Sequence, residues 1–202
     1  LDGTEPIRRL ESFIRPKGIT GTGTVAIVSS ALKSGLIKLP MILTESKKIY
    51  IFGKEIYFTE KDLYEAGKAF GAFRAGHITL ANRAGITIDQ IDSAYMAGAS
   101  GTYVDAYKAQ EVGLLPPSTK RIYQVGNTSL AFACGIAKDP EIMFDAGDLA
   151  RELKATHVMF AEEEAFKNTY VLELGYWENG MSMEEYQMFL KRFDLPEYPK
   201  SR

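Results

Sequence analysis

Residues 93–117 read SAYMAGASGTYVDAYKAQEVGLLPP, and the rest of the chain is organised around this stretch. A short apolar run at residues 94–97, of the kind that fills a buried strand, leads into the small residues GASG at 98–101. A helix-compatible segment follows at residues 105–112. A strand, a small-residue turn and a helix form a ligand crevice in many α/β folds, because a flat or anionic ligand can lie against the peptide groups of the turn. The alternative is a tight turn that needs glycine only for its dihedral angles.

The same order of elements returns further along the chain. A second strand is predicted at residues 121–125, the small residues GNTS follow at 126–129, and a helix is predicted at 130–137. Two strands that each end in a glycine-containing turn are expected where a parallel sheet presents several turns at one end to a shared ligand.

A third glycine-rich turn, GITGTG at residues 18–23, precedes a helix that ends near Gly35. Such a turn offers free N–H groups and the positive end of the helix dipole to an anion. Residues 21–26 also fit the form GxGxxA of a dinucleotide fingerprint, but the preceding segment is a poor strand and the βαβ context is absent. The alternative is that these glycines only permit close packing at the start of the helix.

Helix caps and breaks predict the remaining elements. Thr59 with Asp62 begins a long helix, and Arg74, which stands among its apolar positions, is interpreted as a surface residue rather than an internal anchor. Ser182 with Glu185 begins the last helix. The other predicted elements are a hairpin at 48–58, a helix at 145–154, a strand at 157–160, and a helix at 163–174 with a strand at 170–174 as the other option.

Composition narrows the function classes. The 202 residues carry 46% apolar residues and a net charge of -2, which gives no general attraction to nucleic acid or to an anionic membrane. No apolar run is long enough to span a bilayer and no signal peptide is evident, so we expect a cytoplasmic protein. Cys134 is the only cysteine and is predicted to be a buried, inert thiol. His77 and His157 have no cysteine partners, and no metal site is predicted.

Four blocks in a fixed order resemble one known family. They are GITGTGTVAIVSSALKSGLI from residue 18, IYFTEKDLYEAGKAFGAFRAG from 56, YMAGASGTYVDAYKAQEVGLLP from 95, and VGNTSLAFACGIA from 125. Together they resemble the reductive activators of corrinoid-dependent methyltransferase systems, which include the activases of methylamine methyltransferase corrinoid proteins of methanogens. The resemblance covers about residues 18–175 and includes the family's GICGSG-type turn.

The resemblance implies an α/β fold, one lobe of the ribonuclease H-like domain of actin-like ATPases, with a mixed sheet flanked by helices. It also implies coupling of ATP hydrolysis, with Mg²⁺, to reduction of cob(II)amide to cob(I)amide on a partner corrinoid protein. An iron–sulfur cluster would lie elsewhere in the polypeptide, and a homodimer is possible. Matching the family's motifs assigns the cofactor-binding positions to Gly98, Ala99 and Gly101 at adenosine, to Gly21, Thr22 and Gly23 at the phosphates or the other lobe, and to Gly126 and Asn127 at the second turn.

Some positions depart from the family's pattern. Ala99 stands for the second glycine of the adenosine turn of the wider superfamily, as it does in the activators, whereas Ser100 and Thr102 replace the activators' Phe and Asn. The superfamily's Asp-x-Gly-Thr phosphate loops and the cluster cysteines are not found. We therefore expect residues 1–17 to be an irregular lead-in, 18–180 to be the C-terminal lobe, and 181–202 to be a helix and linker. We expect this chain alone to be inactive as an ATPase, with no catalytic base identifiable. A sugar or acyl kinase lobe, or a non-catalytic docking or dimerisation module, are the alternative functions.

Overall fold

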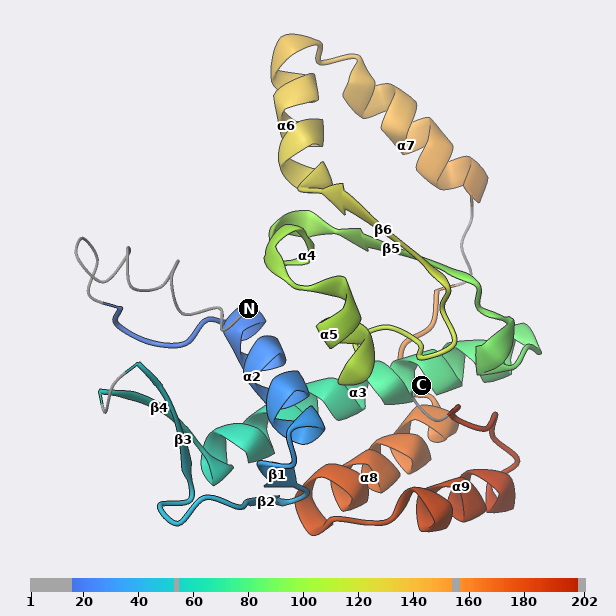
Figure 1. The fold of residues 1–202 in the computed structure, drawn as a ribbon. Coiled ribbons are helices and arrows are strands. Elements are labelled where there is room, and N and C mark those ends of the chain that lie inside the picture. The colour runs from blue at the N-terminus through green and yellow to red at the C-terminus, as the bar shows by residue number, and fades with distance from the viewer. Residues whose placement is uncertain (1–15, 53–54, 154–156, 200–202) are drawn as a thin grey trace.

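The computed structural model describes residues 16–52, 55–153 and 157–199 (Figure 1). Helices occupy more of this part of the chain than strands do. In chain order the elements are α2 (Gly21–Lys33), β1 (Ile37–Lys38), β2 (Met41–Ile42), β3 (Lys48–Phe52), β4 (Ile56–Thr59), α3 (Glu60–Ala84), the 3-10 helix η1 (Ile88–Gln90), β5 (Ser93–Ala97), α4 (Gly98–Tyr103), α5 (Ala106–Glu111), β6 (Arg121–Gly126), α6 (Thr128–Lys138), α7 (Ile142–Leu153), α8 (Glu164–Asn179) and α9 (Met183–Arg192).

The strands of the described residues form three separate two-stranded sheets. The pairs β1–β2 and β3–β4 are antiparallel hairpins, whereas β5 and β6 run parallel. The predicted parallel pair is therefore confirmed. The expected single mixed sheet is not formed within the described residues, because neither hairpin hydrogen-bonds to β5 or β6.

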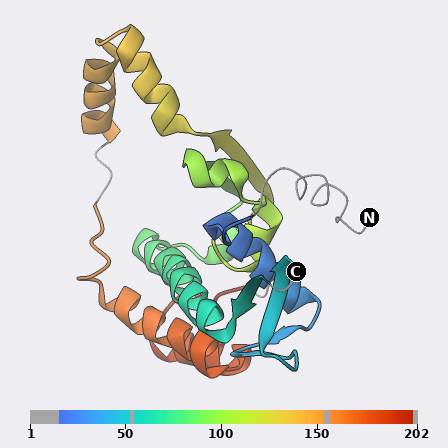
Figure 2. The same cartoon turned by 90° about the vertical axis from the view of Figure 1, so that its left-hand side faces the viewer.

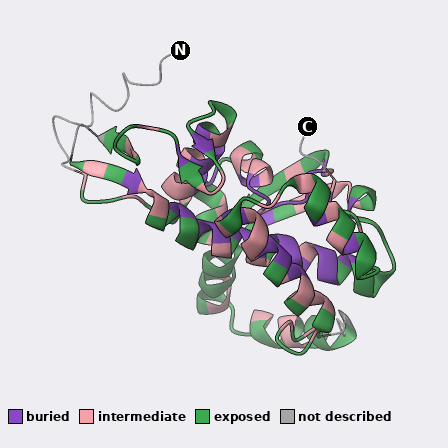
Figure 3. Ribbon diagram, turned by 90° about the horizontal axis from the view of Figure 1, so that it is seen from below, coloured by how far each residue is buried: buried purple, intermediate pink, exposed green. Residues whose placement is uncertain are grey.

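The main core lies along α3, which packs against α8. Two glycines on α3 allow the helices to approach closely: a Cβ added at Gly67 would lie 2.8 Å from Cβ of Trp177, and one added at Gly71 would lie 2.8 Å from Cβ of Glu173. The Trp177 ring packs on Phe70 with 5.3 Å between ring centroids. Figure 3 shows buried residues concentrated along these helices.

The C-terminal segment completes a second cluster of buried side chains. Tyr186 and Leu190 of α9 are fully buried, and Leu195 and Tyr198 beyond α9 are nearly so. Gln187 holds the tail, because its side-chain amide donates to the carbonyl of Tyr198 and accepts from its N–H. The tail, which the sequence suggested was the start of a linker, is packed against the helical core as far as Tyr198.

One strand prediction was wrong. Residues 157–160 form no strand and pair with none of the described strands; instead the Phe160 ring stacks on Phe166 with 4.8 Å between ring centroids. The helix predicted at 163–174 is confirmed as α8, and residues 170–174, for which a strand was the other option, lie inside it. The buried residues of α8 are Thr169, Leu172, Glu173 and Trp177, which recur at helical rather than strand spacing.

Two predictions about single side chains were also wrong. Arg74 is 5% exposed and is an internal anchor rather than a surface residue. Cys134 is exposed rather than buried, because α6 stands with α7 away from the main core and has no buried residue (Figures 1 and 2).

Candidate functional site

Two glycine turns lie side by side at the carboxyl ends of β5 and β6. Ala97 pairs with Gly126 across the parallel strands, so Gly98, the next residue of the first turn, lies beside the second turn. Gly98 has φ +88° and Gly126 has φ +76°, in the left-handed region that favours glycine. A Cβ added at either position would meet no atom within 4 Å. The backbone at both turns is therefore open to a ligand.

The turn after β5 continues directly into the short helix α4, where the sequence indicated only a small-residue turn. Gln124 of β6 fixes this helix, because its side-chain amide donates to the carbonyls of Gly101 (3.0 Å) and Val104 (2.9 Å). Gly101 itself faces β5: an added Cβ would lie 3.3 Å from the carbonyl carbon of Met96. Gly101 thus permits close packing of α4 on β5, while Gly98 borders open space.

The turn after β6 begins α6. Asn127 is the N-cap, and its side-chain oxygen accepts a hydrogen bond from the N–H of Leu130 at 3.1 Å. This leaves the amide NH₂ of Asn127 as a donor at the end of β6. The first N–H groups of α6 lie at the same end of the sheet.

The third predicted segment is the first turn of α2. The Thr20 hydroxyl caps this helix by accepting from the N–H of Gly23 at 3.1 Å, and it lies 3.0 Å from the hydroxyl of Thr22. An added Cβ at Gly21 would meet no atom within 4 Å, whereas one at Gly23 would contact the cap. Helix α4 contacts β6, α6 and α2, so the three predicted segments are gathered around this one helix (Figure 1).

Charge is distributed unevenly along the parallel strands. Asp92 and Arg121 form a salt bridge at the amino-terminal end, and the Arg121 guanidinium, as a hydrogen-bond donor and a positive charge, holds the pKa of Asp92 below its usual range. The carboxyl-terminal end carries no charged residue within 95–102 or 123–130. A ligand bound there meets peptide groups, hydroxyls and amides, which suits a neutral heterocycle or sugar better than a free anion.

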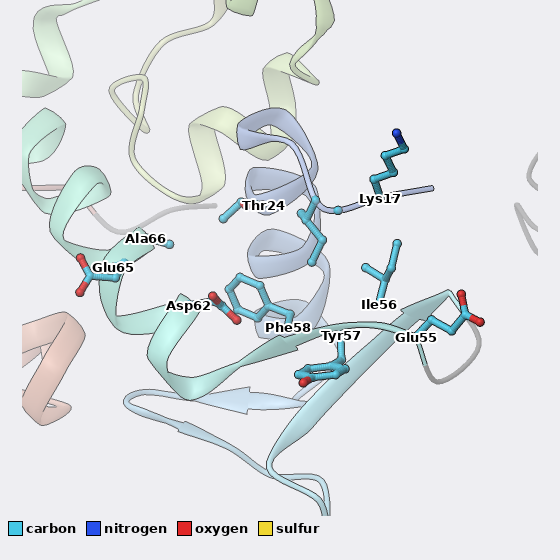
Figure 4. Close-up of a pocket in the computed structure, with 11 residues that line it drawn as sticks. Lys17, Thr24, Glu55, Ile56, Tyr57, Phe58, Asp62, Glu65 and Ala66 are labelled. Atoms are coloured by element: carbon cyan, nitrogen blue, oxygen red, sulfur yellow. The ribbon is translucent and has the colours of Figure 1, made fainter. Parts of the chain in front are cut away.

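A cleft lies next to α2 rather than at the two strand ends (Figure 4). It has a volume of about 600 Å³, and the predicted site residues do not line it. Thr24, one residue beyond Gly23, and Asp62 and Glu65 of α3 are among its lining residues. Asp62 is already engaged in the capping box of α3, where it accepts from Thr59.

Sequence reasoning missed two features of this region. Gln124 gave no signal as the tether of α4, since its role depends on contacts with Gly101 and Val104 about twenty residues earlier in the chain. The ion pair of Arg74 with Glu173 was also missed, although an arginine on an apolar helix face was a signal for it.

The described residues contain neither a cluster of metal ligands nor a helix suited to span a membrane. No group of three or more His, Cys, Asp or Glu side chains is placed to hold a metal ion. Within the same described ranges, the helices lack the combination of length and apolar character that crossing a membrane requires.

Comparison with known proteins agrees with the motifs of the sequence. Residues 3–187 match the family described as the C-terminal domain of RACo, the ASKHA domain. The chain belongs to this family. It is 45% identical over 183 residues to the "[Co(II) methylated amine-specific corrinoid protein] reductase" of Methanosarcina barkeri, which covers 91% of this chain and 34% of that protein.

A second relative has a related name. The "Corrinoid activation enzyme RamQ" of Eubacterium limosum is 30% identical over 132 residues, which is 64% of this chain and 22% of that enzyme. The chain thus spans about a third or less of the length of these two relatives. The resemblance to corrinoid activators is confirmed, and the ASKHA domain is the region of such proteins to which this chain corresponds.

Proposed function

We propose that this chain binds the adenosine part of ATP within a reductive activator that returns cob(II)amide of a corrinoid methyltransferase protein to cob(I)amide. The observation that carries the proposal is the pair of open glycine turns joined by the Ala97–Gly126 register. Parallel strands that end in such turns form a usual crevice for nucleotides. The relative from Methanosarcina barkeri, named as a reductase of a Co(II) corrinoid protein, supports the reaction and the partner.

The open backbone suggests a role for each segment. Adenine or ribose would lie against the peptide groups of Gly98 and Ala99, where no Cβ of residue 98 intervenes. The amide of Asn127 would donate to the nucleoside from the neighbouring turn. The phosphates would lie toward Gly21–Gly23, where the first N–H groups and the positive dipole end of the thirteen-residue helix α2 favour negative charge.

Other groups of the proposed reaction do not fit the residues of this chain. A cysteine-ligated iron–sulfur cluster needs several thiolates, and Cys134 is the only cysteine. The described residues also offer no carboxylate cluster for Mg²⁺. We therefore assign this chain the nucleoside contacts and no part of the electron transfer. Any cluster and the remaining phosphate ligands would come from other parts of the protein.

The decisive experiment measures MgATP affinity of the complete gene product by isothermal titration calorimetry. In Gly98→Val the β-branched side chain would occupy the volume assigned to the nucleoside, so we expect the Kd to rise tenfold or more, about 1.4 kcal/mol. Gly85→Val is the matched control, because Gly85 also has positive φ (+65°) and open space around its Cβ position but caps the far end of α3. Both variants place a β-branched side chain at positive φ.

The outcomes separate the alternatives. If Gly85→Val keeps the parent affinity and Gly98→Val loses it, the nucleotide assignment is supported. Unchanged affinity in a folded Gly98→Val protein contradicts it. A parent protein that binds no nucleotide favours a docking or dimerisation module, and phosphoryl transfer to a sugar or carboxylate would favour the kinase alternative.

A further inference from the structure

Arg74, near the middle of α3, is a buried charge with an unusual set of neighbours. Its Nε lies 3.0 Å from Oε1 of Glu173 on α8, and the side chains of both residues are almost fully buried. The hydroxyl of Tyr186 on α9 donates to the same carboxylate oxygen. Burial of an ion pair is costly, and apolar residues of similar volume often replace such pairs without loss of stability. Packing of the helices alone therefore does not explain why this position is an arginine.

Three tyrosine rings surround the guanidinium. Its Cζ lies 4.6 Å from the ring centroid of Tyr176, 4.5 Å from that of Tyr198 and 5.4 Å from that of Tyr186. Burial by itself would lower the pKa of Arg74, but the negative charge of Glu173 and the tyrosines raises it above its usual range. Arg74 remains a cation, and it joins α3 to α8, α9 and the tail through ionic and cation–π contacts.

The aliphatic stem of Arg74 faces a different part of the chain. A Cβ added at Gly113 would lie 2.5 Å from both Cγ and Cδ of Arg74 and 3.2 Å from the hydroxyl oxygen of Tyr198. Gly113 has φ +85° and follows α5 closely. The end of α5 thus rests directly on the stem of Arg74, with no space for a side chain between them.

Helix α5 connects this contact to both parts of the proposed nucleotide site. At its start, α5 directly follows α4 in the chain. Gln124 of β6 holds the end of α4, because its side-chain amide donates to the carbonyl of Val104. Near its end, Glu111 accepts a hydrogen bond from Ser29 and forms a salt bridge with Lys33, both on α2. A displacement of α5 would therefore move the Gly98 turn and the first turn of α2 relative to each other.

We propose that Arg74 is a positioning residue for the nucleotide site, acting through the contact of its stem with Gly113. This inference rests on the proposed function. The ion pair and the tyrosine rings fix the guanidinium, which leaves the stem as a rigid surface for the end of α5. Helix α5 in turn holds α2 and α4 at the separation that the nucleotide requires.

The first test compares Arg74→Ala with Leu190→Ala in the complete gene product. Leu190 is a fully buried residue of α9 in the same helical core, so its truncation also lowers stability. We expect Arg74→Ala to raise the Kd for MgATP about tenfold, and Leu190→Ala to lower Tm while the Kd stays within about twofold of the parent. Equal Kd values for folded Arg74→Ala and the parent would overturn the inference. A parent that binds no MgATP would overturn the proposed function, and this inference with it.

The second test approaches the same contact from the other side and does not require Arg74→Ala to fold. Gly113→Ala places a methyl group against the stem of Arg74, while Gly85→Ala adds one at positive φ in open space. We expect Gly113→Ala to raise the Kd about threefold or more and Gly85→Ala to leave it unchanged. If both glycine variants bind MgATP like the parent, the stem contact positions nothing and the inference fails.

Discussion

Two regions of the molecule differ in how completely they are packed. The closed half consists of α3, α8, α9 and the tail to Tyr198; eleven residues of α3 alone are buried. The open half consists of β5, α4, β6, α6 and α7; α4 and α6 have no buried residue, and Tyr95, which stacks on Tyr123, is 68% exposed. The glycine turns after β5 and β6 belong to the open half. The closed half therefore provides stability, whereas the open half presents backbone and apolar surface for contacts with other groups.

Electrostatics divides the molecule in the same way. Among the described residues, Arg74, His77, Tyr186 and Tyr198 have strongly shifted pKa values, and all four lie in the closed half. For His77, Tyr186 and Tyr198, burial is the largest cause of the shift in pKa. For Arg74, burial opposes the shift, because it would lower the pKa that the neighbouring charges raise. Solvent reaches the open half, so its side chains carry charge or polarity at less cost.

The largest expected effect tests the packing difference directly. Trp177 is 2% exposed between α8 and α3, and we expect Trp177→Ala to lower the free energy of unfolding by about 3–5 kcal/mol. Leu149 on α7 is 56% exposed, and Leu149→Ala should change the free energy of unfolding by less than about 0.5 kcal/mol. Urea denaturation of both variants measures the difference. Similar losses in the two variants would contradict the difference in packing between the two halves.

A smaller effect should appear in the pH dependence of stability. Burial, with the nearby charge of Arg74 as a second cause, lowers the pKa of His77 from 6.5 to about 4. Between these pH values the unfolded chain binds the proton on His77 more readily than the folded chain does. The contribution of neutral His77 to stability is therefore fully present above pH 6.5 and is lost as the pH falls toward 4. From pH 7 to pH 5 we expect His77 to contribute a loss of about 2 kcal/mol.

The variant His77→Gln checks this assignment, since it should remove that part of the loss in urea denaturation at a series of pH values. His157 is exposed and serves as the control, so His157→Gln should retain the parent's pH dependence. A parent and a His77→Gln variant with parallel pH profiles would contradict the prediction.

The smallest expected effect lies in the open half. Gln124→Ala removes two hydrogen bonds from α4, and we expect a loss of about 1 kcal/mol in stability because both carbonyls can turn to water. The freed α4 should also raise the Kd for MgATP about threefold, measured by calorimetry. Gln110→Ala is the control, because it removes a comparable set of side-chain hydrogen bonds, to the carbonyls of residues 116, 117 and 119. Its Kd for MgATP should lie closer to the parent value than that of Gln124→Ala.

Much of the local structure was determined by the sequence itself. The capping boxes of Thr59 with Asp62 and of Ser182 with Glu185 are present as predicted, and Gly85 ends α3 in the left-handed conformation. The two strand–turn–helix units were also predicted, as was their parallel arrangement. These features depend on residues within a few positions of one another, where capping and backbone preferences act.

Tertiary structure alone decided the features that depend on distant segments. Arg74 is buried because Glu173 and three tyrosines from α8, α9 and the tail surround it, and no local pattern specifies that meeting. Residues 157–160 are not a strand because a strand requires a partner for its backbone hydrogen bonds. Cys134 is exposed because α6 packs on few other elements. Residue type determined the caps and turns, whereas burial followed from which segments the fold brought together.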